Sequence, residues 1–372
     1  MGIGRFAFTP LLPMMAADQG VSVAQGGWLA SANYLGYLAG GLAAVWLRVE
    51  ARTVIAVSLA LICAGTAAMA FTGEFVLWLV LRALAGMASA WTLVFVSGWS
   101  LDRLSALGAP KLGSVVFAGV GAGIALAGGA CLVLMQFGVS SAQAWLVLGG
   151  LALVLCALTW PIFAARTGNR APAVAASSGE FRWSRDAVLL VACYGIFGFG
   201  YIVPATFVPA MAKQAIPDPA VFGWSWPLFG IAAMLSTLAA ARWIAALGNR
   251  KVWVFGVLVM AAGVAAPAMS RGLTAILFSA VCVGGTFMVV TMAGLQEGRR
   301  LGGRHGRELM AAMTSSFAAG QVAGPLAVSW LAAGGRGIDT ALIVSAVLLV
   351  VSAGALVFPT IDRRRTIEAL PE

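Results

Sequence analysis

Residues 141–165 read SAQAWLVLGGLALVLCALTWPIFAA, a run of 25 residues without a charged side chain. A helix rises about 1.5 Å per residue and the bilayer core is about 30 Å thick, so roughly 20 apolar residues span it. Similar runs follow one another along the chain, in which 61% of residues are hydrophobic, 10% are charged and the mean hydropathy is +0.96. Backbone polar groups in lipid must be satisfied within the segment, which favours helices, and the alternating pattern of membrane barrel strands is absent. The sequence therefore predicts an all-α integral membrane protein.

Twelve such runs are predicted, separated by short charged or Gly/Pro-rich breaks. They cover residues 1–17, 24–47, 53–72, 74–100, 112–135, 141–165, 186–212, 219–246, 251–269, 272–296, 308–333 and 338–359. The first run is short for a membrane span and begins at Met1 without a cytoplasmic lead. We therefore expect a truncated first helix, with the natural start upstream of Met1.

Basic residues alternate between the two sides of this arrangement. Of the 23 Lys and Arg residues, eighteen fall in every second predicted loop or tail, and only Lys213, Arg271 and Arg336 fall in the others. Because Lys and Arg mark cytoplasmic loops, both termini and the central loop are expected in the cytoplasm, and the chain in a bacterial cytoplasmic membrane. The net charge of +10 does not indicate a nucleic-acid partner, since no soluble domain carries a basic face.

The longest break is residues 166–185, RTGNRAPAVAASSGEFRWSR. Its small, polar and basic composition is typical of a flexible linker. It divides the chain into residues 1–165 and residues 186–372, each with six predicted spans, and the second part ends in a short cytoplasmic tail. The predicted fold is therefore two bundles of six helices.

The two halves begin alike. GIGRFAF at 2–8 corresponds to GIFGFGY at 195–201, and a pair of prolines follows in each half. The prolines are Pro10 and Pro13 in one half and Pro204 and Pro209 in the other. Parallel repeats of this kind place a substrate site between the halves, near the bilayer midplane.

Two short motifs carry a family resemblance. RALAGMASA at 82–90 is similar to the RxxxGxxxA element of span 4 in the major facilitator superfamily (MFS), and GQVAGP at 320–325 is similar to its GxxxGP element in span 11. The opening GIGRFAFTPLLPMM at 2–15 resembles the uncharacterised YbfB/YjiJ-type branch of that superfamily. The loop signature GxxxDRxGRR is poorly kept, with Ala245 where the superfamily has Asp. The resemblance implies a monomeric secondary carrier that works by alternating access and is coupled to protons.

Arg5 and Arg82 are the two basic residues predicted far from the ends of their spans. Arg5 lies roughly 18 Å from the periplasmic end of its span and Arg82 about 12 Å from Glu74. A charge at such depth costs at least ~2.5–3.5 kcal/mol unless it faces a cavity or a partner, and no Asp or Glu is predicted deep in any span. Either arginine faces the cavity and binds an anionic group through its planar fork, or it is structural and binds backbone carbonyls or a carboxylate at a span end.

Uncharged polar residues are also predicted at depth. They are Asn33, Tyr34, Tyr37, Tyr201 and Gln321. Each either hydrogen-bonds the substrate or ties helices together, an interaction worth only about 0.6 kcal/mol on average. Trp91 and Trp226 are predicted deeper than the tryptophans at the span ends, and either line the cavity or pack in the core.

Glycines four residues apart allow two helices to approach closely. The pairs are Gly36 with Gly40, Gly119 with Gly123, and Gly320 with Gly324, and Gly86 lies in the RxxxGxxxA element. They predict tight packing. A sharper alternative is that spans 5 and 11 bend and slide where the halves meet, helped in span 11 by Pro325.

The predicted function is secondary active transport of a small organic solute, with an anion as the first candidate. No nucleotide-binding signature GxxxxGK[ST] occurs, and no catalytic constellation lies inside the spans, so an enzyme is not predicted. A non-transporting membrane sensor or scaffold is the first alternative, although the longest loop is about 20 residues, and a membrane-embedded enzyme is the second. The five cysteines form no CxxC pair and the single His305 lies in a basic loop, so no metal, cofactor or disulfide framework is expected. The expected partners are the substrate and membrane lipid.

Overall fold

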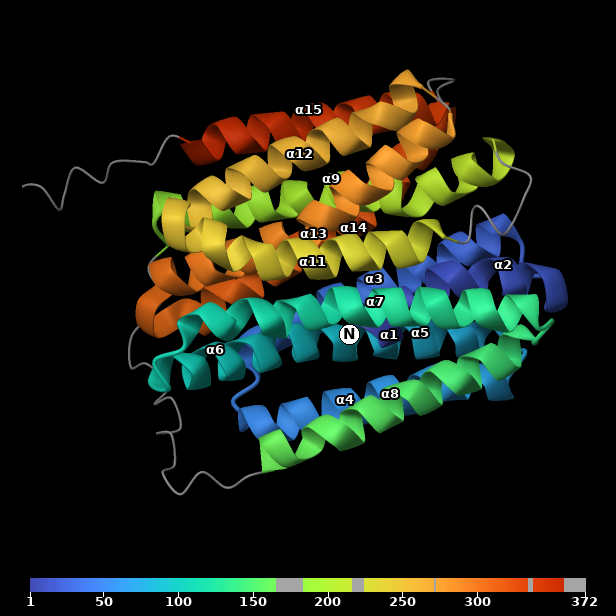
Figure 1. Ribbon diagram of the computed structural model, residues 1–372, viewed down its shortest axis with the longest axis horizontal. Coiled ribbons are helices and arrows are strands. Elements are labelled where there is room, and N and C mark those ends of the chain that lie inside the picture. Colours follow the sequence, from blue (N-terminus) through green and yellow to red (C-terminus); the bar gives the residue numbers. More distant parts are fainter. Residues whose placement is uncertain (165–182, 216–223, 271, 334–336, 358–372) are drawn as a thin grey trace, which may run out of the picture.

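The computed structural model describes residues 1–164, 183–215, 224–270, 272–333 and 337–357, and every regular element within them is a helix (Figure 1). The first helices are α1 (Gly2–Phe6), α2 (Phe8–Asp18), α3 (Val23–Trp46), α4 (Ala51–Ala68), α5 (Phe75–Trp91), α6 (Ser97–Ala106), α7 (Gly113–Gln136) and α8 (Ser141–Ala164). The later helices are α9 (Arg185–Ala215), α11 (Ser225–Leu247), α12 (Asn249–Met269), α13 (Leu273–Gly302), α14 (Gly306–Ala333) and α15 (Gly337–Val357). A π-helical turn at Thr92–Val96 joins α5 to α6.

Within the described residues, nine segments are long and apolar enough to cross a membrane. One of them, Leu273–Val328, contains all of α13 and most of α14. Another, Phe75–Ala106, contains α5 and α6. Large apolar side chains are exposed on these helices, among them Leu153 and Leu158 on α8, as lipid contact requires. The predicted class, an all-helical membrane protein, is confirmed.

Local sequence signals set the helix ends at one end of the molecule. Ser22 and Gln25 form a capping box at the start of α3, in which each side chain accepts a hydrogen bond from the other residue's backbone N–H. Asp18, the last residue of α2, accepts hydrogen bonds from the backbone N–H and the hydroxyl of Ser141, the hydroxyl at 2.8 Å. The carboxylate therefore joins the end of α2 to the first turn of α8.

The helices fall into two groups. In Figure 1 the N-terminal helices α1–α8 (blue to green) lie in the lower part and the C-terminal helices α9–α15 (yellow-green to red) in the upper part. The groups meet mainly where α7 packs against α11 and where α3 packs against α14. We call this contact surface the seam. Side chains of α1 reach this surface, since the ring of Phe6 lies 5.7 Å from that of Phe287 on α13.

The predicted glycine pairs mostly lie within one group. A Cβ added at Gly86 of α5 would collide with the Asn33 carbonyl of α3, and Gly36 lies equally close to Ala83 of α5. On the other side of the seam, Gly320 of α14 faces the Gly195 carbonyl of α9 and Gly324 faces Ile202. Pro325 follows inside α14, which continues through it to Ala333. These glycines therefore hold together helices of the same group.

Two glycine expectations need correction. Gly119 is exposed, and a Cβ added there would have no atom within 4 Å, whereas Gly123 packs on Gly2 of α1. A glycine of α7 that does face the seam is Gly121, where a Cβ would lie 2.8 Å from the Gly230 carbonyl of α11. Residues two apart on a helix point about 200° away from each other, so the motif indicated a close approach but marked the wrong face.

In α14 the glycine motif faces α9 rather than the seam. A close seam contact of α14 lies instead at Ser315, whose hydroxyl would be 2.9 Å from a Cβ at Gly41 of α3. A small-residue pair shows that a neighbour is close, but it does not identify that neighbour.

Candidate functional site

The helical hydrogen-bond pattern of the first predicted span is interrupted at Ala7, between α1 and α2, while Ala7 keeps helical backbone angles (φ −63°, ψ −25°). Because proline has no N–H, Pro10 leaves the Phe6 carbonyl, four residues earlier, without its helical partner. The indole Nε1 of Trp226, in the first turn of α11, donates a hydrogen bond to this oxygen at 3.2 Å. A C-terminal helix thus binds the interruption in an N-terminal helix.

Arg82 of α5 binds backbone carbonyls of α1 next to the same interruption. Its Nη1 donates to the Gly4 carbonyl at 3.4 Å and its Nη2 to the Arg5 carbonyl at 3.3 Å, and its Cζ lies 4.6 Å from the ring centre of Phe8. The Asn33 side-chain Nδ2 donates to the Arg82 carbonyl at 2.9 Å. Arg82 therefore makes the contacts of the structural alternative, and Asn33 ties α3 to α5.

Arg5 makes contacts on both sides of the seam. Its Nη2 donates a hydrogen bond to Oε1 of Gln321 on α14. Its Cζ lies 3.9 Å from the ring centre of Tyr37 and 5.9 Å from that of Tyr34, both on α3. The Arg5 side chain is 3% exposed, and such desolvation makes a cation–π contact worth up to about 2 kcal/mol. Arg5, Tyr34, Tyr37 and Gln321 therefore form one cluster.

The cluster contains buried polar atoms without hydrogen-bond partners in the described part of the chain. They are Nε and Nη1 of Arg5, the Tyr37 hydroxyl and Nε2 of Gln321. Oδ1 of Asn33 is also buried without a hydrogen-bond partner in these residues. A buried polar group left unpaired costs about 1–3 kcal/mol. A polar ligand would therefore gain hydrogen bonds here that these residues do not make with one another.

No carboxylate pairs with Arg5 among the described residues. The ion pairs found there are Asp186 with Arg250 at 2.9 Å, Glu297 with Arg300 at 2.7 Å, and Asp102 with Arg299. The last pair joins α6 to α13 and so crosses the seam. Within the described part of the chain, Arg5 therefore contacts ring faces and the Gln321 amide but no negative charge.

Tyr201 lies in an aromatic cluster beside these residues. Its ring stacks on Phe287 of α13 at 4.4 Å and lies 6.2 Å from Phe317 of α14. Two N-terminal rings reach the same cluster, since Phe6 lies 5.7 Å from Phe287 and Tyr37 lies 6.3 Å from Phe317, both edge to face. The rings therefore form a continuous group across the seam.

Sequence reasoning missed three residues of this region and the hydrogen bond of a fourth. Phe6, Phe287 and Phe317 are apolar, so nothing in their own chemistry separates them from the other phenylalanines of the chain. Trp226 was predicted to be deep, but its hydrogen bond depends on a carbonyl freed by Pro10, more than 200 residues away. The available signal was the proline itself, which marks an unpaired oxygen.

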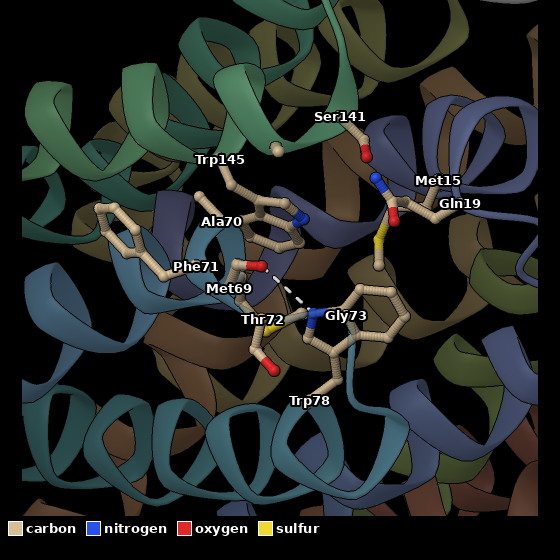
Figure 2. Close-up of a pocket in the computed structure, with 11 residues that line it drawn as sticks. Met15, Gln19, Met69, Ala70, Phe71, Thr72, Gly73, Trp78, Ser141 and Trp145 are labelled. Atoms are coloured by element: carbon tan, nitrogen blue, oxygen red, sulfur yellow. Dashed lines mark hydrogen bonds between the residues drawn. The ribbon is translucent and has the colours of Figure 1, made fainter.

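A cavity of about 250 Å³ lies elsewhere, between the end of α2, the α4–α5 connection and the start of α8 (Figure 2). Trp78 and Trp145 form its walls, and Trp78 Nε1 donates to the Met69 carbonyl at 3.2 Å. None of the predicted site residues lines this cavity, and no charged residue does. It therefore does not replace the Arg5 cluster as the candidate site.

The comparisons with known proteins agree with this architecture. Residues 1–357 match the family described as "Uncharacterised MFS-type transporter YbfB". No curated protein matches the chain in sequence. The crystal structure of the human organic anion transporter MFSD10 (TETRAN) is similar, with a TM-score of 0.71, 16% identity, and coverage of 95% of this chain and 96% of that one.

The crystal structure of the nucleoside transporter NupG is also similar, with a TM-score of 0.63, 15% identity, and coverage of 96% of this chain and 97% of that one. At these identities the likeness to both structures shows a shared fold and nothing finer. The family match likewise covers almost the whole chain, residues 1–357 of 372. The protein therefore belongs to the YbfB-type family of MFS transporters.

Proposed function

We propose that the protein is a secondary active transporter that moves a small organic anion across a bacterial cytoplasmic membrane by alternating access. The observation that carries this proposal is the Arg5 guanidinium. It is buried at the seam, it bonds to Gln321 across it, and its Nε and Nη1 have no partner in the described residues. A site between two halves that move against each other is the arrangement alternating access needs.

We further propose twelve membrane spans in two bundles, residues 1–165 and 186–372, with both termini cytoplasmic and a monomeric protein. The nine apolar segments become ten spans when α13 and α14 are counted separately. The interrupted α1–α2 and the 24-residue α3 supply the other two. The linker at 166–185 lies largely outside the described residues, with only its last three in them, and remains an expectation from composition.

An anionic cargo follows from the energetics of Arg5. Burial of a guanidinium without a carboxylate partner has a large desolvation free energy. An opposite charge that forms good hydrogen bonds with it offsets this free energy. A carboxylate accepts from two N–H groups of the planar fork at once. One structural neighbour is named an organic anion transporter, which agrees with this choice, while the nucleoside transporter has the same fold and another cargo.

Proton coupling, which the family resemblance implies, would need a group that titrates during the cycle. Glu297 of α13 is buried, with 4% of its surface exposed, and is held by Arg300 through two hydrogen bonds of 2.7 and 2.9 Å. We propose that any coupling through Glu297 requires this pair to open. Uptake measured with and without an imposed pH gradient, in wild type and in Glu297→Gln, tests that step.

The proposed function is tested by uptake into proteoliposomes. A panel of carboxylates, neutral sugars and amines of similar size is offered to the wild-type protein and to Arg5→Gln. We expect uptake of one or more carboxylates by the wild type only. Equal uptake of a neutral solute by both proteins would remove Arg5 from the site, and no uptake of any solute would favour the sensor or scaffold alternative.

A further inference from the structure

We propose that the anion is a monocarboxylate that carries an aromatic ring, with its carboxylate at Arg5 and its ring among the aromatic side chains of the seam. This inference rests on the proposed function and names the substrate class for the same site. The aromatic seam is defined here as five rings: Phe6 and Tyr37, which lie beside Arg5, Phe287 and Phe317, which these two contact across the seam, and Tyr201, which stacks on Phe287.

The rings and the guanidinium are contiguous. Arg5 lies 3.9 Å above the ring of Tyr37, and its neighbour in sequence, Phe6, lies 5.4 Å from the same Cζ. Tyr37 continues to Phe317 and Phe6 continues to Phe287, both by edge-to-face contacts. A ligand that reaches the guanidinium from the seam therefore meets aromatic faces at once.

The aromatic wall on the C-terminal side is deep. Tyr201 of α9 stacks on Phe287 with an angle of 15° between the planes, and Phe197 lies 5.0 Å from Phe317. Each of these rings is buried. Three helices, α9, α13 and α14, therefore present one aromatic surface to the Arg5 side of the seam.

The seam contacts are the ones that alternating access must break. Phe6 and Tyr37 belong to N-terminal helices, whereas their ring partners belong to C-terminal helices. When the groups move apart, these ring–ring contacts are broken and the rings become exposed to water, which is unfavourable for apolar surface. A cargo ring that enters between them restores edge-to-face or stacked contacts, each worth about 0.5–1.5 kcal/mol beyond burial.

The charge of the site fits one carboxylate. Arg82 is the other buried guanidinium in the described residues, and it is committed to the Gly4 and Arg5 carbonyls. The aromatic seam itself carries no further cation. A second carboxylate on the same ligand would therefore be buried against ring faces without a positive partner, at a large desolvation cost.

The test is ligand binding to the purified wild-type protein by isothermal titration calorimetry, with four probes. Benzoate has the ring and one charge, cyclohexanecarboxylate has the charge on a saturated ring, phthalate has two charges, and benzyl alcohol has a ring without charge. We expect benzoate to bind about 2- to 10-fold more tightly than cyclohexanecarboxylate, as one aromatic contact would give. Phthalate and benzyl alcohol should bind at least about tenfold more weakly than benzoate.

Two leucine variants make the test specific to the seam. Phe287→Leu removes a seam ring and should reduce the preference for benzoate over cyclohexanecarboxylate to about one. Phe163→Leu removes a ring that lies 5.0 Å from Trp99 in another cluster and should leave the preference unchanged. If Phe287→Leu does not fold, Phe317→Leu takes its place.

The outcomes separate the two proposals. Equal affinity of the wild type for benzoate and cyclohexanecarboxylate overturns the aromatic class and leaves anion transport standing, and so does a preference that Phe287→Leu retains. If phthalate binds more tightly than benzoate, the inference that the ligand carries a single carboxylate is overturned. Binding of no carboxylate at all, together with transport of uncharged solutes, would instead remove the proposed function.

Discussion

At the scale of single residues, two arginines at similar depth have different surroundings. Sequence position predicted that both are buried, and the structure places both at 3% exposure. What the sequence could not predict is their partners. Arg82 binds carbonyls of a helix 77 residues away, and Arg5 binds Gln321 across 316 residues, so each assignment depended on which helices are neighbours.

This difference predicts opposite effects on stability. Arg82→Leu leaves the Gly4 and Arg5 carbonyls unpaired inside the protein, each at a cost of about 1–3 kcal/mol, so the melting temperature should fall by several degrees. Arg5→Gln removes a buried charge that has no carboxylate partner, so its melting temperature should stay the same or rise. Thermal unfolding of the two variants in the same detergent measures both.

Equal loss of stability in the two variants would show that Arg5 is also structural. Arg82→Lys serves as the control. It keeps the positive charge and the N–H donors of an ammonium group but loses the planar fork, so its melting temperature should lie between those of wild type and Arg82→Leu.

At the scale of helices, apolar length predicted the long helices well, whereas the sequence predicted poorly which faces pack together. The run at 141–165 became α8 at Ser141–Ala164 because length and apolarity alone decide whether a segment suits the membrane. The face of a helix that meets its neighbour depends on small side chains whose partners lie far along the chain. Gly121 was missed and Gly119 was chosen for this reason.

The same helix offers a matched pair of substitutions. Gly121→Val should push α7 away from α11, because its Cβ would overlap Gly230 and the α11 backbone, with an overpacking cost of about 1–3 kcal/mol or more. Gly119→Val meets no atom within 4 Å and should leave both stability and transport near wild type. The test is the melting temperature and the uptake of both variants. Equal melting temperatures and equal uptake in the two variants would contradict the packing of α7 on α11.

The interruption of the first helix gives a prediction of its own. Trp226→Phe keeps an apolar ring but removes the donor that satisfies the Phe6 carbonyl across the seam. Loss of one such hydrogen bond should lower the unfolding free energy by about 1–3 kcal/mol. Trp224→Phe is the control, because Trp224 is exposed at the start of the same helix and should tolerate the change.

At the scale of the whole molecule, the seam is closed where α3 meets α14 and where Asp102 on α6 pairs with Arg299 on α13. Cysteines at Gly41 and Ser315 would lie close enough for a disulfide, because a Cβ at Gly41 is 3.4 Å from the Ser315 Cα. In a background without native cysteines, oxidation of Gly41→Cys/Ser315→Cys should stop transport and a reducing agent should restore it.

The control for this cross-link is a native pair within one group. Cys63 on α4 and Cys156 on α8 have sulfur atoms 3.5 Å apart, and both helices are N-terminal. A protein that retains only these two cysteines should keep transporting after oxidation, because the bond would not join the two groups. Loss of transport in both proteins would mean that the groups do not move against each other as rigid units.

The central claim is that Arg5 binds the anion between the two groups of helices. It is tested most directly by exchange of the best-transported radiolabelled carboxylate across proteoliposomes that contain wild type, Arg5→Lys or Arg5→Gln, each with its melting temperature. We expect exchange to fall at least about tenfold in Arg5→Lys, which keeps the charge but loses the fork, and to background in Arg5→Gln, with both proteins folded. Wild-type exchange by folded Arg5→Gln would contradict the claim.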